Sequence, residues 1–113
     1  MKEYAFTVNL KDEPGVIEQY EAYHDAIWPE VAESLKTVGM QQVKIWRLGR
    51  RLFMLITTDD AFDPDQAAIV HRASHPRVLE WEELMDSFQE PVPEADNVST
   101  WAEMGRVFTL TPP

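Results

Sequence analysis

A hairpin near the middle of the chain limits the folds that this sequence can adopt. Residues 40–48 (Met-Gln-Gln-Val-Lys-Ile-Trp-Arg-Leu) predict one strand, a short turn begins at Gly49, and residues 52–58 predict the returning strand. The returning strand begins Leu-Phe-Met-Leu-Ile, without the alternation of apolar and polar residues that is typical of a half-exposed strand. We therefore expect both of its faces to be covered, one by helices and the other, most simply, by a second copy of the chain.

The segments around this hairpin predict a single α+β domain over residues 1–113. A period of two residues predicts a strand at 4–10 and a last strand at 104–110. A period of three to four residues predicts a helical stripe at 16–35 and helices at 63–72 and 76–88. Pro29 lies inside the first helical pattern and removes a backbone donor, so we expect a bend near residues 25–28. The order β-α-β-β-α-β is that of a ferredoxin-like fold. An irregular connection at 89–100, rich in proline and acidic residues, precedes the last strand.

Charge and composition narrow the partners of such a domain. The formal net charge is −10 and the isoelectric point is near 4.6. An acidic surface repels phosphate groups, which disfavours nucleic acid, anionic membranes and phosphorylated substrates as partners. The chain has no cysteine, which excludes disulfides, thiolate catalysis and cysteine-bound metal. No apolar run approaches the ~20 residues of a membrane span and no signal-peptide pattern is present, so we expect a cytoplasmic protein with a neutral small-molecule ligand.

One histidine stands out as a candidate for chemistry. Tyr20, His24 and Trp28 are four residues apart, so on a helix they share one face. Imidazole is the side chain whose ordinary pKa lies nearest neutrality. A proton-transfer group beside aromatic surfaces suits a polar, uncharged, ring-shaped ligand such as a sugar. The competing interpretation is that His24 is only a packing residue on an amphipathic helix.

Other polar residues have weaker signals. His71 and His75 are spaced as two ligands of a metal on one helix would be, but Pro76 moves His75 out of helical geometry and no third ligand is evident. We therefore expect no metal. Trp81 belongs to an apolar stripe and is expected in the core, whereas Glu82 lies one position off that stripe and could border a cavity.

The chain resembles the L-rhamnose mutarotase family over essentially its whole length. The specific match is Tyr20 followed by His24-Asp25-Ala26-Ile27-Trp28-Pro29-Glu30, and residues 51–54, 81–85 and 106–110 support it. The resemblance implies a dimeric α+β barrel, in which two ferredoxin-like sheets face each other. It also implies cofactor-free interconversion of the α and β anomers of a 6-deoxy-hexose. The catalytic histidine of the family falls on His24, and its substrate-contacting residues fall on Tyr20 and Trp81.

Two positions depart from the rhamnose-type pattern of this family. Val43 replaces a sugar-contacting tyrosine on the second strand, and Glu82 replaces a second tryptophan after Trp81. Residues 62–64, the Trp81-Glu82 pair and Trp101 look more like the L-fucose branch. We therefore expect L-fucose to be favoured over L-rhamnose.

The mechanism implied by the resemblance needs only proton transfer. We expect His24 to be the main proton-transfer residue and to donate to the ring oxygen of the sugar, with Trp28 and Trp81 supplying apolar faces. The second proton-transfer group is left open between Glu82, Tyr20 and water. Two alternatives share the expected fold: a cofactor-light monooxygenase, and a non-catalytic sugar- or metabolite-binding protein.

Overall fold

The strands form one antiparallel sheet. In the computed structural model, which describes residues 1–95 and 100–111, they are β1 (Lys2–Leu10), β2 (Met40–Leu48), β3 (Arg51–Thr58), β4 (Gln89–Glu90) and β5 (Ala102–Met104). The order is β2-β3-β1-β4, and β5 also pairs with β1. β1 therefore lies inside the sheet, between the hairpin and an edge made of two short strands. This is the ferredoxin-like topology that the order of elements predicted.

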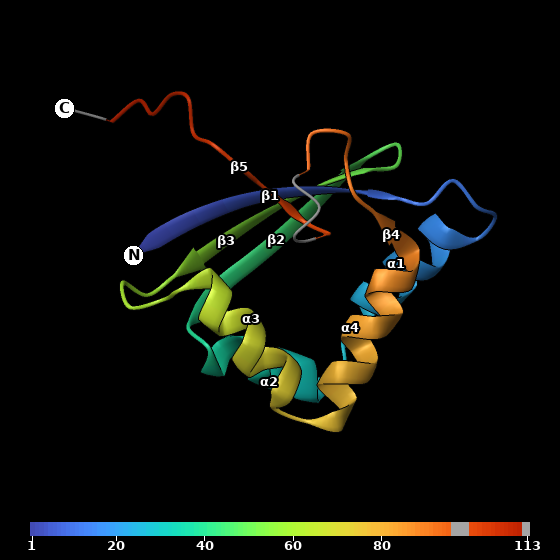
Figure 1. Cartoon of the computed structure of the whole chain (residues 1–113), viewed down its shortest axis with the longest axis horizontal. Helices are drawn as coiled ribbons and strands as arrows, with labels where there is room; N and C mark the ends of the chain where they lie inside the picture. Colours follow the sequence, from blue (N-terminus) through green and yellow to red (C-terminus); the bar gives the residue numbers. More distant parts are fainter. Residues whose placement is uncertain (96–99, 112–113) are drawn as a thin grey trace.

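The helices lie together on one face of this sheet (Figure 1). They are α1 (Val16–Asp25), α2 (Pro29–Thr37), α3 (Pro64–Ala73) and α4 (Pro76–Phe88). Three of them begin with proline, which suits the first helical position because its missing N–H would have no partner there. Within the described residues, no helix is long and apolar enough to cross a membrane.

The sequence predicted some of these elements with their observed ends. The second strand and the last helix have the predicted bounds. The expected bend at 25–28 is a complete break, because α1 ends at Asp25 and Trp28 has the extended backbone of a residue that precedes a helix (φ −67°, ψ 134°). The proline that follows Trp28 disfavours helical geometry at that residue.

The prediction of a last strand at 104–110 is wrong. β5 ends at Met104, and residues 105–111 form a tail that leaves the sheet (Figure 1). The pairing of β1 with β5 limits how far such a strand could extend. Met104 lies opposite Ala5, so a strand continued in this register would reach Lys2 at residue 107 and then have no strand to pair with. The edge is completed instead by β4, which pairs with Asn9 and Leu10 at the other end of β1.

The core lies between the sheet and the helices. Val8 and Leu10 of β1 and Leu52 of β3 are buried there, and they pack with buried residues of the helices such as Val78 and Met85. The opposite face of the sheet has a different environment. The rings of Trp46 and Phe53 lie 5.5 Å apart, tilted by 40°, on neighbouring strands of that face, and Trp46 is 51% exposed. The helices thus cover one face of β3, as expected, and the half-exposed Trp46 lies on the other face of the sheet.

Candidate active site

His24 lies in the last turn of α1 with its imidazole oriented by the backbone. Its Nδ1 atom is 2.8 Å from the carbonyl oxygen of Tyr20, one turn earlier in the same helix. A carbonyl oxygen can only accept, so Nδ1 must carry the hydrogen and donate it. In the neutral ring, Nε2 is then the unprotonated nitrogen. His24 is part-buried, so the ring is neither sealed in the core nor surrounded by water.

Two aromatic rings contact this imidazole, and a third joins the cluster through one of them. The Tyr20 ring lies 4.3 Å from the His24 ring, and the Trp81 indole of α4 lies 5.3 Å from it. Trp28 stacks edge-on against Trp81 at 5.2 Å, and the Arg77 guanidinium lies 3.8 Å from the Trp28 ring. Trp81 is therefore the centre of the cluster.

The sequence predicted the members of this cluster but not the way in which they meet. We expected Tyr20, His24 and Trp28 to share one helical face. Only Tyr20 and His24 do so, because Trp28 lies outside α1 and immediately before α2. Trp28 reaches the cluster through its contact with Trp81. Trp81 belongs to the core, as its apolar stripe predicted, and its indole also contacts the His24 ring.

Burial shifts the pKa of two residues of α1, His24 and Tyr20. It is the largest influence on His24 and lowers the pKa of the imidazole below its usual value of 6.5, although the Tyr20 carbonyl and the Asp25 charge act in the opposite direction. His24 is therefore a neutral base at pH 7. Burial also raises the pKa of the Tyr20 hydroxyl to about 12; a hydrogen bond with Gln89 opposes this shift and the Glu82 charge adds to it. Tyr20 can donate a hydrogen bond to a ligand, but it is not a base near neutral pH.

Glu82 is linked to a polar network between α2, α3 and α4. Its Oε1 atom is 2.7 Å from Nε2 of His71, and Nδ1 of the same imidazole is 2.7 Å from the Ser34 hydroxyl. His71 is 5% exposed, and the Glu82 side chain is 27% exposed. His71 was considered above only as a metal ligand, and Ser34 was not considered. No spacing in the sequence joins three residues on three different helices, so only the tertiary structure could reveal this network.

The structure also places the remaining predicted residues, Val43, His75 and Trp101. Val43 is on β2 opposite Ile56, on the face of the sheet that the helices cover. His75 precedes α4, and its Nδ1 accepts a hydrogen bond from the backbone N–H of Arg77. His71 and His75 thus have separate structural partners. Trp101 is partly buried against the core.

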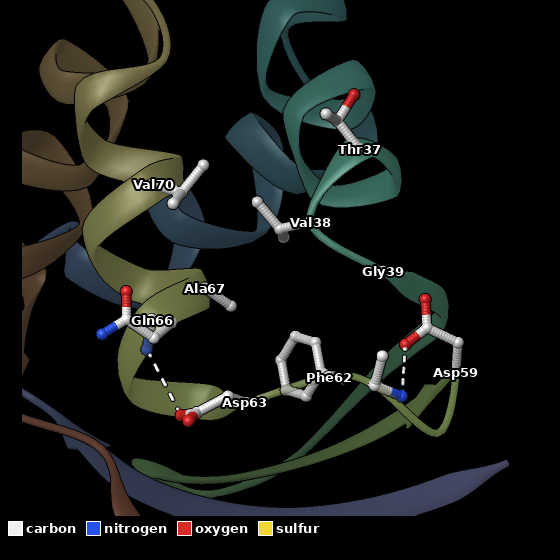
Figure 2. A pocket seen from close by; sticks show the side chains of 10 residues that line it. Thr37, Val38, Gly39, Asp59, Phe62, Asp63, Gln66, Ala67 and Val70 are labelled. Carbon is white, nitrogen blue, oxygen red and sulfur yellow. Dashed lines mark hydrogen bonds between the residues drawn. The ribbon is translucent and has the colours of Figure 1, made fainter.

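Two hollows on the described part of the surface lie away from His24. Figure 2 shows the larger one, about 430 Å³, between the end of α2 and the start of α3. Its apolar lining comes from Val38, Phe62, Ala67 and Val70. The carboxylates of Asp59 and Asp63 accept nearby backbone N–H groups and therefore serve the turn and the start of α3. A second hollow, about 280 Å³, is lined by residues that include Ser34 and His75. Neither is lined by His24 or Trp81.

The fold and this cluster define a class: a small ferredoxin-like α+β protein in which a neutral imidazole lies against aromatic rings. The profile of the L-rhamnose mutarotase family matches residues 3–110. The chain is 37% identical over 113 residues to an L-fucose mutarotase of Xanthomonas campestris pv. campestris, covering 98% of this chain and 90% of that protein. It is 32% identical over 111 residues to an L-rhamnose mutarotase of Sinorhizobium fredii, covering 98% and 100%.

A crystal structure supports the same fold. The L-rhamnose mutarotase of Formosa agariphila aligns with a TM-score of 0.70 at 22% identity, covering 98% of this chain and all of that one. The chain belongs to the L-rhamnose mutarotase family, as its resemblance to that family indicated.

Proposed function

We propose that this protein is an aldose mutarotase that interconverts the α and β anomers of a 6-deoxy-hexose, with L-fucose favoured over L-rhamnose. Membership of the family supports the reaction class, and the names of its relatives support both sugars. The observation that carries the proposal is the hydrogen bond from His24 Nδ1 to the Tyr20 carbonyl, because it leaves Nε2 as a base beside aromatic surfaces. We propose the cytoplasm as its compartment.

In the proposed mechanism, His24 accepts a proton before it donates one. Nε2 takes the proton of the anomeric hydroxyl, the bond from the anomeric carbon to the ring oxygen breaks, and an aldehyde forms. The protonated imidazole then returns its proton to the former ring oxygen, which is the donation expected from the family resemblance. Rotation of the aldehyde and the reverse steps close the other anomer. The two oxygens are bonded to the same carbon, so one nitrogen can serve both in turn.

The surrounding side chains would bind and orient the sugar. The indoles of Trp28 and Trp81 offer apolar surfaces to C–H groups and to the methyl group of a 6-deoxy sugar. The Tyr20 hydroxyl would donate to a sugar oxygen. The preference for L-fucose rests on Val43 and Glu82, which give this chain an aliphatic group and a carboxylate where the rhamnose-type pattern has two aromatic residues.

Anomer exchange followed by NMR saturation transfer tests this proposal. The purified protein is expected to accelerate exchange of L-fucose more than that of L-rhamnose, and to have little effect on D-galactose and D-glucose. His24→Gln removes the base and should lower the rate by about 10²–10⁴-fold, the usual contribution of positioned proton transfer. His75→Asn is the matched control, because asparagine can still cap α4.

Unchanged exchange in His24→Gln would remove this residue from the mechanism. Thermal stabilisation by L-fucose without faster exchange in the wild type would indicate the non-catalytic binding protein instead.

We also propose that the protein is a homodimer that buries the outer face of the sheet. Trp46 and Leu48 of β2 are 51% and 85% exposed, and Phe53 of β3 lies beside Trp46. A second copy would cover this apolar face, as the sequence of β3 predicts. Analytical ultracentrifugation should give twice the chain mass for the wild type and the chain mass for Trp46→Lys. A monomeric wild type would contradict the proposal.

A further inference from the structure

A ring of hydrogen bonds joins Ser34, Ser74 and His71. The Ser74 hydroxyl donates to the carbonyl oxygen of His71 at 2.7 Å, and the Ser34 hydroxyl lies 2.9 Å from the Ser74 hydroxyl. Each hydroxyl has a single hydrogen. Ser74 uses its hydrogen on the carbonyl, so Ser34 must donate to Ser74. Ser34 then has no hydrogen for His71, and the 2.7 Å contact between them requires His71 Nδ1 to be the donor.

A hydrogen also lies between Nε2 of His71 and the Glu82 carboxyl oxygen. Nε2 and the Glu82 carboxyl oxygen are 2.7 Å apart, too close for two lone pairs to face each other. An imidazole ordinarily binds a proton more tightly than a carboxylate does, so the hydrogen belongs to Nε2. In this arrangement both nitrogens of His71 donate, as an imidazolium paired with a carboxylate does.

We propose that the imidazolium of His71 fixes Glu82 as an ionised hydrogen-bond acceptor for the hydroxyl groups of the sugar, with Ser34 and Ser74 maintaining that state. His71, Ser34 and Ser74 are then positioning residues, and Glu82 is the residue that contacts the substrate. The inference deepens the proposed function and rests on it for the identity of the ligand. Glu82 is the position at which the chain departs from the rhamnose-type pattern, so the network bears on sugar selectivity.

The position of Glu82 supports this role. Glu82 follows Trp81, whose indole lies against His24. The negative charge of Glu82 also contributes to the raised pKa of the Tyr20 hydroxyl on α1. One carboxylate oxygen is held by His71 while about a quarter of the side chain is exposed. An ion pair buried at the His71 end and open at the Glu82 end restricts the carboxylate to one orientation. A fixed acceptor of this kind binds hydroxyl groups with little loss of side-chain entropy.

The protonation of His71 can be measured without any sugar. Long-range ¹H–¹⁵N correlation spectra of the full-length protein at neutral pH should give two protonated nitrogens for His71 and one unprotonated nitrogen for His24. Ser74→Ala frees the Ser34 hydrogen to point at His71 Nδ1, so one nitrogen of His71 should lose its proton. Ser74→Thr keeps the hydroxyl and should retain the wild-type spectrum. An unprotonated nitrogen on His71 in the wild type would overturn the inference.

The role in substrate binding is tested with the exchange assay. Ser34→Ala should raise KM for L-fucose about 5- to 10-fold, roughly the effect of one hydrogen bond, while kcat stays within about twofold because His24 is untouched. Ser87→Ala is the matched control, since Ser87 is an exposed serine on α4 whose hydroxyl donates to a carbonyl of its own helix. Equal KM values for the two variants, with both folded by circular dichroism, would refute the positioning role.

The two arms separate the possible failures. If the wild type does not accelerate exchange of any sugar, the proposed function fails and the spectra still decide the state of His71. If exchange is fast and His71 is neutral, the mutarotase proposal stands and the inference about the network is wrong.

Discussion

Replacing Trp81 should affect both the stability of the protein and the titration of His24. The indole is 5% exposed and contacts the rings of Tyr23, His24 and Trp28 at 6.1, 5.3 and 5.2 Å. Truncation of a buried tryptophan to alanine costs about 3–5 kcal/mol. At about 4 °C per kcal/mol for a chain of this size, the melting temperature of Trp81→Ala should fall by roughly 12–20 °C.

Two further variants make this estimate specific to the indole. Trp81→Phe keeps a ring against His24 and should cost only about 1–2 kcal/mol. Leu79→Ala lies on the same helix at a side chain that is 41% exposed, and a surface substitution of this kind should change stability by about 0.5 kcal/mol or less. Urea denaturation followed by circular dichroism measures all three values.

The second consequence concerns His24. Burial is the main cause of its lowered pKa, and Trp81 is the indole packed against the ring. Removal of the indole admits water, so the His24 pKa in Trp81→Ala should rise toward its usual value, as measured by NMR titration. The reasoning would be refuted if Trp81→Ala cost no more than Leu79→Ala, or if the His24 pKa stayed unchanged in a folded variant.

Three other predictions follow from the same geometry. The exchange rate should be constant above about pH 6.5 and fall as the pH decreases through the lowered pKa of His24, because only the neutral ring is a base. A rate that rises on acidification would contradict the assignment of His24 as the base. Tyr20→Phe should reduce kcat/KM about 3- to 10-fold through one lost hydrogen bond. The pH–rate profile between pH 6 and 9 should not change, because the hydroxyl pKa of about 12 keeps Tyr20 protonated there. A profile that changes shape would assign Tyr20 a proton-transfer role. Gly39→Ala should destabilise the fold by about 1–3 kcal/mol in urea denaturation. Gly39 has φ +105°, and an added Cβ would lie 2.8 Å from Asp59 Oδ2. Gly105→Ala is the control and should be neutral, because the space around Gly105 is open.

The sequence contained enough information for most of the fold because local periodicity and local breakers determine it. Residues 40–48 and 76–88 have patterns that end at Gly49 and begin at Pro76, and the structure keeps these bounds. The prediction of the last strand was wrong for a non-local reason. Apolar residues at 104–110 fit a strand, but whether they pair depends on how far β1 extends beside them.

The candidate site could be predicted only where chain neighbours form it. His24 and Tyr20 are one helical turn apart, so their contact follows from spacing alone. Trp28 joins the cluster by a different route, because it lies outside α1, immediately before Pro29, and packs on Trp81. The link from Ser34 to Glu82 has no counterpart in sequence spacing, because it depends on how three helices pack.

The partner that orients His24 belongs to the main chain and not to a side chain. Every residue type supplies the same carbonyl at position 20, so no point substitution there deletes this acceptor while α1 keeps its last turn. Specificity can therefore be redesigned by exchanging the neighbouring side chains, and the tautomer of the base should survive each exchange. A protein engineer can therefore change the side chains that select the sugar without changing the reactive nitrogen of His24.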